Sequence, residues 1–256
     1  MFRPGGMQNR PSKIKKIKMY HRPKNTMKMT ELEALRSRHS VRKYQDRPLD
    51  DAAVKALQEE IERLNREGNL HMQLVLNERK AFKGFLSYGS FSNVSNYIMI
   101  IGKKSDSLEY RAGYYGEKLV LFAQGIGLNT CFVGLTYKKI DEAFEVGRDE
   151  RVLLCVAIGY GEADGYRNHK IKRPDQVSNI AADSPDWFKE GVEAALLAPT
   201  AINQQKFYFE YVAPDKVKPS KGTSLAGYTK IDLGIAMYNF EVGAGRQHFH
   251  WLDSPL

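Results

Sequence analysis

The sequence has few cysteines and no long hydrophobic run. Only Cys131 and Cys155 occur among 256 residues, and both lie in apolar stretches. A disulfide framework is therefore excluded, and we expect buried free thiols in a reducing compartment. The two cysteines also lack the spacing of zinc ligands. No apolar run approaches the roughly 18 residues that suggest a membrane span. We expect a cytoplasmic protein with no membrane partner and no metal.

The first 28 residues lack acidic side chains. They carry nine of the 39 Lys and Arg residues, which leaves 30 basic against 30 acidic residues in the rest of the chain. The net charge of +9 therefore belongs to residues 1–28, which predict a disordered basic tail. Such a tail is typical of an arm that binds nucleic acid or a membrane surface, or of an upstream extension before Met27 or Met29. The absence of interleaved aromatic residues favours the extension, and we expect no nucleic-acid partner.

Residues 29–256 alternate between helical and extended patterns. Thr30 and Glu33 have the capping-box spacing at the start of a helix over 30–40. Apolar periodicity predicts a second helix over 48–69. The remaining predictions are strands at 70–77, 96–102, 151–161 and 207–214, a long apolar helix over 107–134, a helix over 184–198 with Ser184 as N-cap, and a helix over 228–245.

Two of the predicted helices share a pattern. In an ungapped alignment, three glycines and one phenylalanine of 107–134 coincide with those of 228–245: Gly116 with Gly234, Phe122 with Phe240, Gly125 with Gly243, and Gly127 with Gly245. This register suggests an internal duplication, with halves of about 29–180 and 184–256. The alternative is that helix ends attract glycine.

Three separated stretches combine cations, hydroxyls and amides. They are "RHSVRK" at 38–43, "HKIKRP" at 169–174 and "APTAINQQKF" at 198–207. Arg and Lys bind phosphate, and amides pair with the edge of a flat ring. No nucleophile–base pair accompanies them. The set is typical of a site for a polyanionic, heteroaromatic ligand.

These stretches resemble motifs of the nitroreductase family of FMN-dependent oxidoreductases. The first is similar to the family's Arg-Arg/His-Ser-x-Arg/Lys signature, and "APTAINQQKF" to its Ala-Pro-Ser-x-x-Asn-x-Gln-Pro-Trp loop. "GYGEADGYRNHKIKRP" resembles the family's glycine turn and phosphate-binding segment. The likeness covers about residues 30–245. The late position of the amide loop resembles the subgroup in which one chain holds both halves of the usual dimer.

The resemblance implies a fold and a set of roles. The fold would be α+β in three layers, a mostly antiparallel sheet with helices around it. Arg42 would be the catalytic residue, steadying negative charge on the reduced flavin. Gly134 and Leu135 would pass close to the ring. The further FMN-binding residues would be Arg38, His39, Ser40, Lys170, Lys172, Arg173, Asn203, Gln204 and Gln205.

The implied reaction takes hydride from NAD(P)H and reduces a small electron-poor acceptor, such as a nitroaromatic or a quinone. One chain would hold one FMN, as a monomer built like a dimer or as a homodimer. The family's Pro-Trp is Lys206-Phe207 here, so the loop can be set differently. A flavin-binding sensor or store without turnover shares the same motifs, and the basic tail leaves a nucleic-acid-binding protein as a further alternative.

Other side chains have simpler interpretations. Arg36 and Lys43 are typical of solvated helix-end charges. Tyr88, Tyr114 and Tyr115 favour packing over lining a pocket. The two histidines of "RQHFHW" lack a third metal ligand nearby.

Overall fold

The computed structural model describes residues 29–83, 91–162, 170–224 and 227–256. The predicted basic tail, 1–28, lies outside these residues. Within them the helices are α1 (Glu31–Ser37), α2 (Asp51–Gly68), α3 (Leu108–Gly125), α4 (Asp186–Ala195) and α5 (Thr229–Ala244). The strands are β1 (Gln73–Val75), β2 (Asn96–Lys103), β3 (Asn129–Val133), β4 (Glu150–Gly159), β5 (Phe207–Val212), β6 (Lys216–Lys221) and β7 (His250–Trp251). No helix among the described residues is both long and apolar enough to cross a membrane.

The strands form two sheets. The first has the order β1-β2-β4-β3 and is antiparallel throughout, with Met99 opposite Cys155 and Phe132 opposite Val156. The second has the order β5-β6-β7, in which β5 and β6 are antiparallel and β7 is parallel to β6. The predicted α+β class with mostly antiparallel strands is confirmed.

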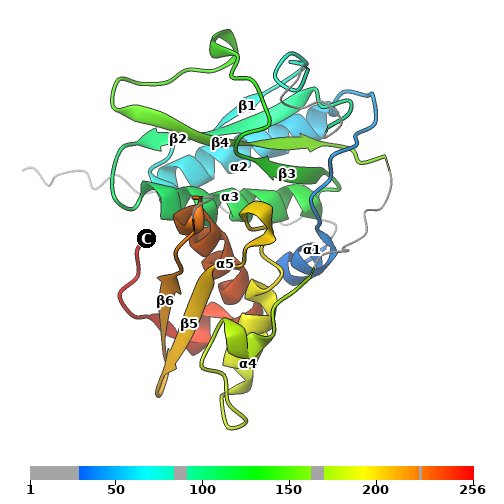
Figure 1. Cartoon of the computed structure of the whole chain (residues 1–256). Helices are drawn as coiled ribbons and strands as arrows, with labels where there is room; N and C mark the ends of the chain where they lie inside the picture. The colour runs from blue at the N-terminus through cyan, green and yellow to red at the C-terminus, as the bar shows by residue number, and fades with distance from the viewer. Residues whose placement is uncertain (1–28, 84–90, 163–169, 225–226) are drawn as a thin grey trace, which may run out of the picture.

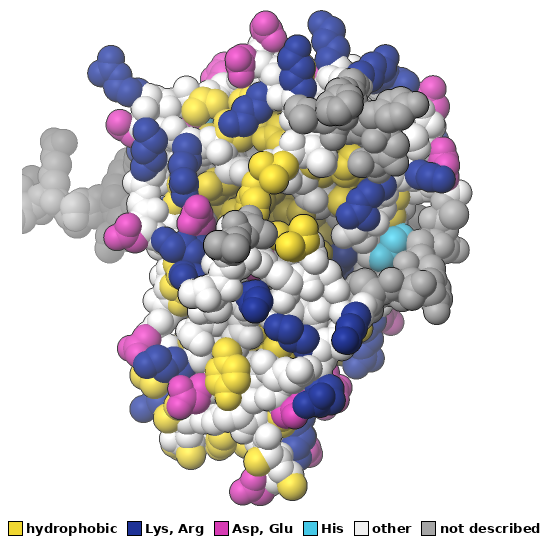
Figure 2. Space-filling model, viewed as in Figure 1, with side chains coloured by type: hydrophobic (Ala, Val, Ile, Leu, Met, Phe, Trp, Pro, Cys, Tyr) yellow, Lys and Arg dark blue, Asp and Glu magenta, His cyan; other side chains and the backbone are white. Residues whose placement is uncertain are grey.

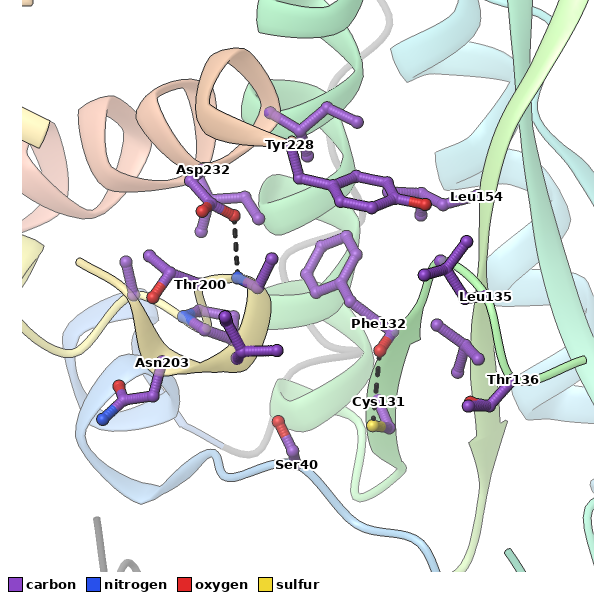
Figure 3. Close-up of a pocket in the computed structure, with 18 of the residues that line it drawn as sticks. Ser40, Cys131, Phe132, Leu135, Thr136, Leu154, Thr200, Asn203, Tyr228 and Asp232 are labelled. Atoms are coloured by element: carbon purple, nitrogen blue, oxygen red, sulfur yellow. Dashed lines mark hydrogen bonds between the residues drawn. The ribbon is translucent and has the colours of Figure 1, made fainter. Parts of the chain in front are cut away.

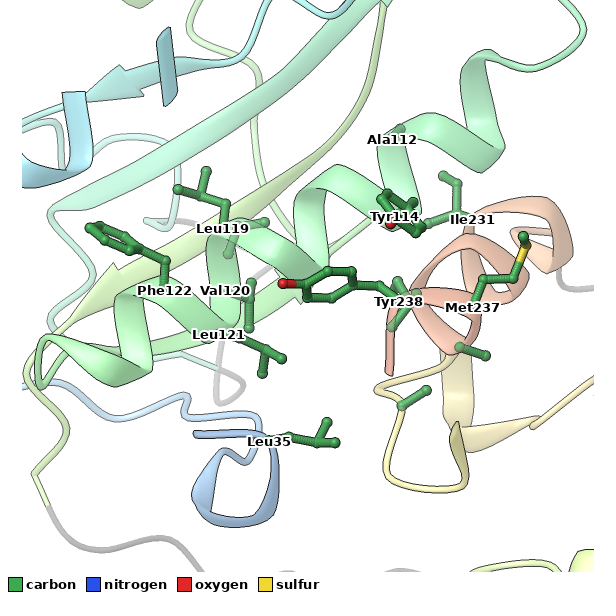
Figure 4. Close-up of a cluster of buried hydrophobic side chains, with 14 of the residues drawn as sticks. Leu35, Ala112, Tyr114, Leu119, Val120, Leu121, Phe122, Ile231, Met237 and Tyr238 are labelled. Carbon is green, nitrogen blue, oxygen red and sulfur yellow. The ribbon is translucent and has the colours of Figure 1, made fainter. Parts of the chain in front are cut away.

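Helices α3 and α5 form the centre of the molecule (Figure 1). α3 lies along the first sheet, α5 packs against α3, and α4 and the second sheet pack against α5. Figure 4 shows part of this core, in which Leu35 of α1, Val120 of α3 and Tyr238 of α5 are buried together. Strand β2 is covered on both faces, because its alternate residues belong to two different apolar clusters. Burial on both faces explains its continuous hydrophobic sequence.

The predicted long helix over 107–134 is wrong beyond residue 125. α3 ends there, and 129–133 form strand β3. Gly127 has a φ of +89°, its N–H donates to Gln124, and the N–H of Leu128 donates to Ala123. These two bonds form a Schellman motif, which stops a helix at a left-handed glycine. The apolar residues after it fit a buried strand as well as a helix, so hydrophobicity alone could not separate the two.

The other boundaries differ by a few residues. The capping box of Thr30 and Glu33 is confirmed, since each side chain accepts a hydrogen bond from the other's backbone N–H. The predicted strand over 70–77 is shortened to β1. Ser184 does not cap α4, because Pro185 precedes the helix and the Ser184 hydroxyl accepts from the N–H of Ala181.

A close approach of two glycines joins α3 and α5. A Cβ added at Gly113 would lie 2.0 Å from the carbonyl oxygen of Ile231, and one at Gly234 would lie 2.1 Å from that of Tyr110. In both cases the obstructing carbonyl belongs to the residue three positions before the facing glycine. The crossing is therefore nearly symmetric, and Gly113, rather than the aligned Gly116, is the glycine of α3 that faces Gly234.

The order of elements also repeats. α2-β1-β2-α3 is followed by α4-β5-β6-α5, and in each unit the two strands pair antiparallel. This repetition is what an internal duplication would leave, and the duplication itself stays a prediction.

Substitution of Gly234 by Ala is expected to destabilise the fold. The added methyl group has only backbone to meet, so the two central helices must separate, at a cost of about 2 kcal/mol or more in the free energy of unfolding. Urea denaturation followed by circular dichroism measures this change.

Gly222→Ala is the matched control, because the nearest atom to its added Cβ would be at an ordinary 3.4 Å. It is expected to change stability by less than about 1 kcal/mol. Equal midpoints of urea denaturation for the two variants would contradict the close approach of α3 and α5 at Gly234.

Candidate functional site

A cavity of about 780 Å³ opens between residues of the 38–154 part of the chain and residues of the 197–235 part. Its walls come from the segment after α1, from β3 and the residues after it, from the segment after α4, and from the first turns of α5, with Phe91 and Leu154 completing it. Figure 3 shows Ser40, Cys131 and Phe132 on one side and Thr200, Asn203 and Asp232 on the other. On the face shown in Figure 2, apolar side chains gather at a central hollow and Lys and Arg side chains lie around it.

The basic segment after α1 is attached to an edge strand. Ser40 forms a parallel bridge with Thr130 of β3, and the N–H of Val41 donates to the carbonyl of Thr130 at 3.0 Å. Val41 points into the apolar cluster on the far side of the first sheet. The side chains on either side of it, Arg38, His39, Ser40 and Arg42, all line the cavity.

Arg38 connects the two halves. Its side chain is only 4% exposed, and Nη1 donates to the carbonyl of Leu197, 3.4 Å away, at the end of α4. Arg42 lies further along the segment and is exposed. Both guanidinium groups belong to the cavity wall, where they give it a positive potential.

The amide loop, Thr200–Gln205, has an unusual backbone. Ile202, Asn203 and Gln205 have φ values of 46°, 55° and 46°, in the left-handed region that a β-branched residue such as isoleucine rarely adopts. The N–H of Gln205 donates to the hydroxyl of Thr200, and the N–H of Ala201 donates to a carboxylate oxygen of Asp232. Such strain concentrates at functional sites, where the surroundings hold it in place.

Only one of the three predicted amides reaches the cavity. Asn203 lines it, with Nδ2 donating to the carbonyl of Lys170 at 2.8 Å. Gln204 turns away and donates through Nε2 to Asp232 and to the carbonyl of Gly227. Gln205 is buried and accepts from the N–H of Lys172 while donating to the carbonyl of Lys170. The two glutamines therefore hold the loop and are absent from the cavity wall.

The basic segment 170–173 lies beside this loop, outside the cavity wall. The ammonium group of Lys172 donates to the carbonyl of Gln205 at 2.6 Å, and the Arg173 guanidinium pairs with Asp175. Lys170 is exposed. His169, the first residue of that motif, falls outside the described residues. Their roles as phosphate ligands stay a prediction.

Gly134 and Leu135 lie on the cavity wall, and their closeness to a flavin ring stays a prediction. A Cβ at Gly134 would come within 2.6 Å of the Tyr228 hydroxyl, so a larger residue there would have to displace the tyrosine ring. Leu135 and Ile202 are the most exposed large hydrophobic side chains of the described residues, at 74% and 84%. They line one cavity from opposite halves of the chain.

The sequence did not single out several cavity residues, among them Thr200, Phe132, Tyr228 and Asp232. Asp232 is 2% exposed, and burial raises its pKa to about 6 despite the hydrogen bonds that it accepts from Ala201 and Gln204. Its signal was present as a lone acid early in the apolar stretch of α5. Phe132 was hidden within the predicted long helix.

Of the remaining candidates that the structure describes, Cys131 alone is part of the cavity wall. Tyr114 is buried between α3 and α5 and donates to Glu241, Tyr115 packs against Gly68, and Tyr88 lies outside the described residues. His248 contacts the carbonyl of Ala244, and no group of metal ligands occurs among the described residues. Cys131 lines the cavity, but burial raises the pKa of its thiol, which disfavours the nucleophilic thiolate.

The buried carboxyl predicts a pH dependence of stability. The pKa of Asp232 rises from 3.8 in the unfolded chain to about 6 in the fold. The protonated carboxyl therefore contributes to the free energy of unfolding fully below about pH 4, and this contribution is lost as the pH rises through 6. The free energy of unfolding of the wild type minus that of Asp232→Asn should fall by up to about 3 kcal/mol from pH 4 to pH 7. Urea denaturation at each pH measures the difference. A difference independent of pH would contradict the assignment.

Comparison with known proteins places the chain. The family model described as "Putative TM nitroreductase" matches residues 31–244. The crystal structure of a "putative nitroreductase" from Thermotoga maritima is 20% identical, with a TM-score of 0.58 over 89% of this chain and 88% of that chain. No curated protein matched.

Two further solved structures match a smaller part. An FMN-dependent nitroreductase from Clostridium difficile is 20% identical, with a TM-score of 0.44 over 53% of this chain and 91% of its own. A "putative nitroreductase" in complex with FMN from Exiguobacterium sibiricum is 17% identical, with a TM-score of 0.45 over 59% of this chain and 97% of its own. Since the family model spans most of the described residues, the chain belongs to the nitroreductase family.

Proposed function

We propose that this protein is an FMN-dependent oxidoreductase that takes hydride from NAD(P)H and reduces a small electron-poor acceptor, such as a nitroaromatic or a quinone. The observation that carries the proposal is the cavity between the halves, where two arginines, hydroxyls and an amide face apolar walls. Membership of the nitroreductase family supports the same chemistry.

The residues present fit a flavin mononucleotide. The cavity volume of about 780 Å³ lies within the usual range for cofactor pockets, roughly 300–1,000 Å³. Phe132, Leu154 and Ile235 provide apolar wall for a flat ring system. Guanidinium groups are suited to a phosphate and to the negative charge of a reduced ring.

Each side chain has a role that follows from its chemistry. When bound, FMN supplies the hydride transfer, and the protein supplies binding, orientation and charge. Arg38, His39 and Ser40 would hold the phosphate and ribityl chain. Arg42 would stabilise negative charge on the ring, and Asn203 would pair with the ring edge.

The segment 170–173 would add positive charge beside the phosphate. Lys170, Lys172 and Arg173 belong to a segment that is hydrogen-bonded to the amide loop. They would either contact the phosphate directly or support FMN binding by holding that loop. We propose one FMN per chain. The sequence has one copy of "RHSVRK" and one of "APTAINQQKF", and both contribute residues to the same cavity. The chain would work as a monomer built like a dimer or as a homodimer, in the cytoplasm.

The visible absorption spectrum of the purified protein tests the proposal. A yellow protein that loses its colour with NAD(P)H under anaerobic conditions, and regains it with a quinone or a nitroaromatic, is the expected result. A yellow protein that NAD(P)H does not bleach would favour flavin binding without turnover. A protein that takes up no FMN would contradict the proposal.

Arg42→Gln is expected to slow flavin reduction. Removal of a charged donor from the ring edge costs about 1.5–3 kcal/mol of stabilisation, so the reduction rate should fall roughly tenfold to a hundredfold and the flavin potential should become more negative. Stopped-flow absorbance and equilibration with a redox dye measure the two quantities.

Arg36→Gln is the matched control, since Arg36 is exposed on α1 and absent from the cavity wall. It should behave as the wild type. Equal rates and potentials for the two variants would remove Arg42 from this role.

The apolar pair at the cavity wall, Leu135 and Ile202, is expected to favour acceptors with an apolar substituent. Methyl and butyl 4-nitrobenzoate share one nitroaromatic ring and differ by three methylenes. A buried methylene contributes about 0.8 kcal/mol, so kcat/KM should rise about tenfold from methyl to butyl even with partial burial. Steady-state kinetics with both esters measure the ratio.

The double variant Leu135→Ser with Ile202→Ser should lose most of this preference. Val146→Ser is the control, because Val146 is also partly exposed but does not line the cavity. A preference that survives in the double variant would show that the two side chains do not contact the acceptor.

A further inference from the structure

Asp232 occupies an unusual position for a buried acid. It lies in the first turn of α5, faces the cavity and is 2% exposed. One carboxylate oxygen accepts from the N–H of Ala201 at 2.9 Å, drawn as a dashed line in Figure 3, and the other accepts from Nε2 of Gln204 at 2.6 Å. Both partners belong to the amide loop, so one side chain holds it at two points.

The loop needs such a constraint. Three of its residues, Ile202, Asn203 and Gln205, have positive φ, a backbone conformation that is strained above all for isoleucine. Hydrogen bonds to a charged acceptor are among the stronger ones, so the two bonds to Asp232 oppose that strain. They act together with the bonds from Gln205 to Thr200 and from Asn203 to the carbonyl of Lys170.

The other half of the chain has a counterpart. Asp232 lies two residues before Gly234, and Arg111 lies two residues before Gly113, its partner in the helix crossing. The Arg111 guanidinium donates to the carbonyls of Gly68 and Asn69, in the turn between α2 and β1. In both parts of the chain, the residue two positions before the crossing glycine therefore forms hydrogen bonds to the turn that follows the preceding helix.

Arg111 and Asp232 hold their turns through opposite hydrogen-bonding roles, one as a donor and the other as an acceptor. Arg111 donates to backbone carbonyls, whereas Asp232 accepts from a backbone N–H and a side-chain amide. The turn held by Arg111 is short and contains one left-handed residue, Asn69. The loop held by Asp232 carries Asn203 to the cavity.

We propose that Asp232 is a positioning residue of the cavity, which fixes the amide loop through Ala201 and Gln204 and so sets the affinity for the flavin. The effect on flavin affinity rests on the proposed function. The fastening of the loop can be measured in the protein without FMN, so each claim has its own test.

Two variants test the hydrogen bond between Asp232 and Gln204, the first by removing the carboxylate and the second by exchanging donor and acceptor. In Asp232→Asn an amide replaces the carboxylate, so the negative charge is lost and only one oxygen remains to accept from the two donors. In the double variant Asp232→Asn with Gln204→Glu, the new carboxylate at 204 accepts from the new amide at 232. Arg111→Met is the matched control, because it loosens the equivalent turn of the other half.

Hydrogen exchange at the N–H of Ala201, without FMN, measures how firmly Asp232 holds the amide loop. Loss of a hydrogen bond to a charged group should raise the exchange rate about tenfold or more in Asp232→Asn. The double variant should recover most of the protection, and Arg111→Met should retain it. Unchanged exchange in Asp232→Asn would overturn the proposal whether or not the protein binds FMN.

Fluorescence titration with FMN measures the affinity. Asp232→Asn should raise Kd by about tenfold or more, and the double variant should return it to within a few-fold of the wild type. Failure of the double variant to recover would show that Asp232 acts by direct contact and would overturn the positioning role. A wild type that does not bind FMN would remove the proposed function and leave the exchange result to stand alone.

If Asp232→Asn does not fold, Gln204→Met breaks the second hydrogen bond and keeps the carboxylate. It should raise Ala201 exchange and Kd in the same direction. No change in either quantity would contradict the proposal.

Discussion

The close approach of α3 and α5 at Gly113 and Gly234 is the contact on which the rest of the structure depends. With no side chain between them, each glycine packs directly against the backbone of the other helix. This contact brings the segment after α1, which is attached to β3, next to the loop after α4, which is attached to the start of α5. The cavity lies where the two meet, so its geometry depends on how the two units pack together.

The sequence predicted the features that are encoded locally. The capping box of α1 and the apolar strands β2, β4 and β5 depend on neighbours in the chain, and the structure has them. The mostly antiparallel pairing followed from the family resemblance, and the structure has it too. Asn203 lies at the cavity, and its contact with the flavin stays a prediction. The strand β3 was missed, because a buried strand and a buried helix have equally apolar sequences.

Long-range contacts account for the remaining differences. Gln204 and Gln205 turn toward Asp232 and the 170–173 backbone, partners that lie about 30 residues away in the chain. The glycine of α3 that faces Gly234 depends on how the two helices cross, and it is Gly113, three residues before the Gly116 with which the alignment pairs Gly234. Asp232 belongs to no motif and stands out in the sequence only as a lone acid in an apolar stretch, so its role follows from its burial and its two partners.

A crystal structure of the chain grown with FMN tests the central claim most directly. The account predicts one flavin per chain in the cavity between the halves, with Arg38 or a neighbouring donor at the phosphate and Arg42 and Asn203 at the ring. A flavin bound elsewhere, two equivalent flavins per chain, or a cavity without flavin at saturating FMN would contradict it.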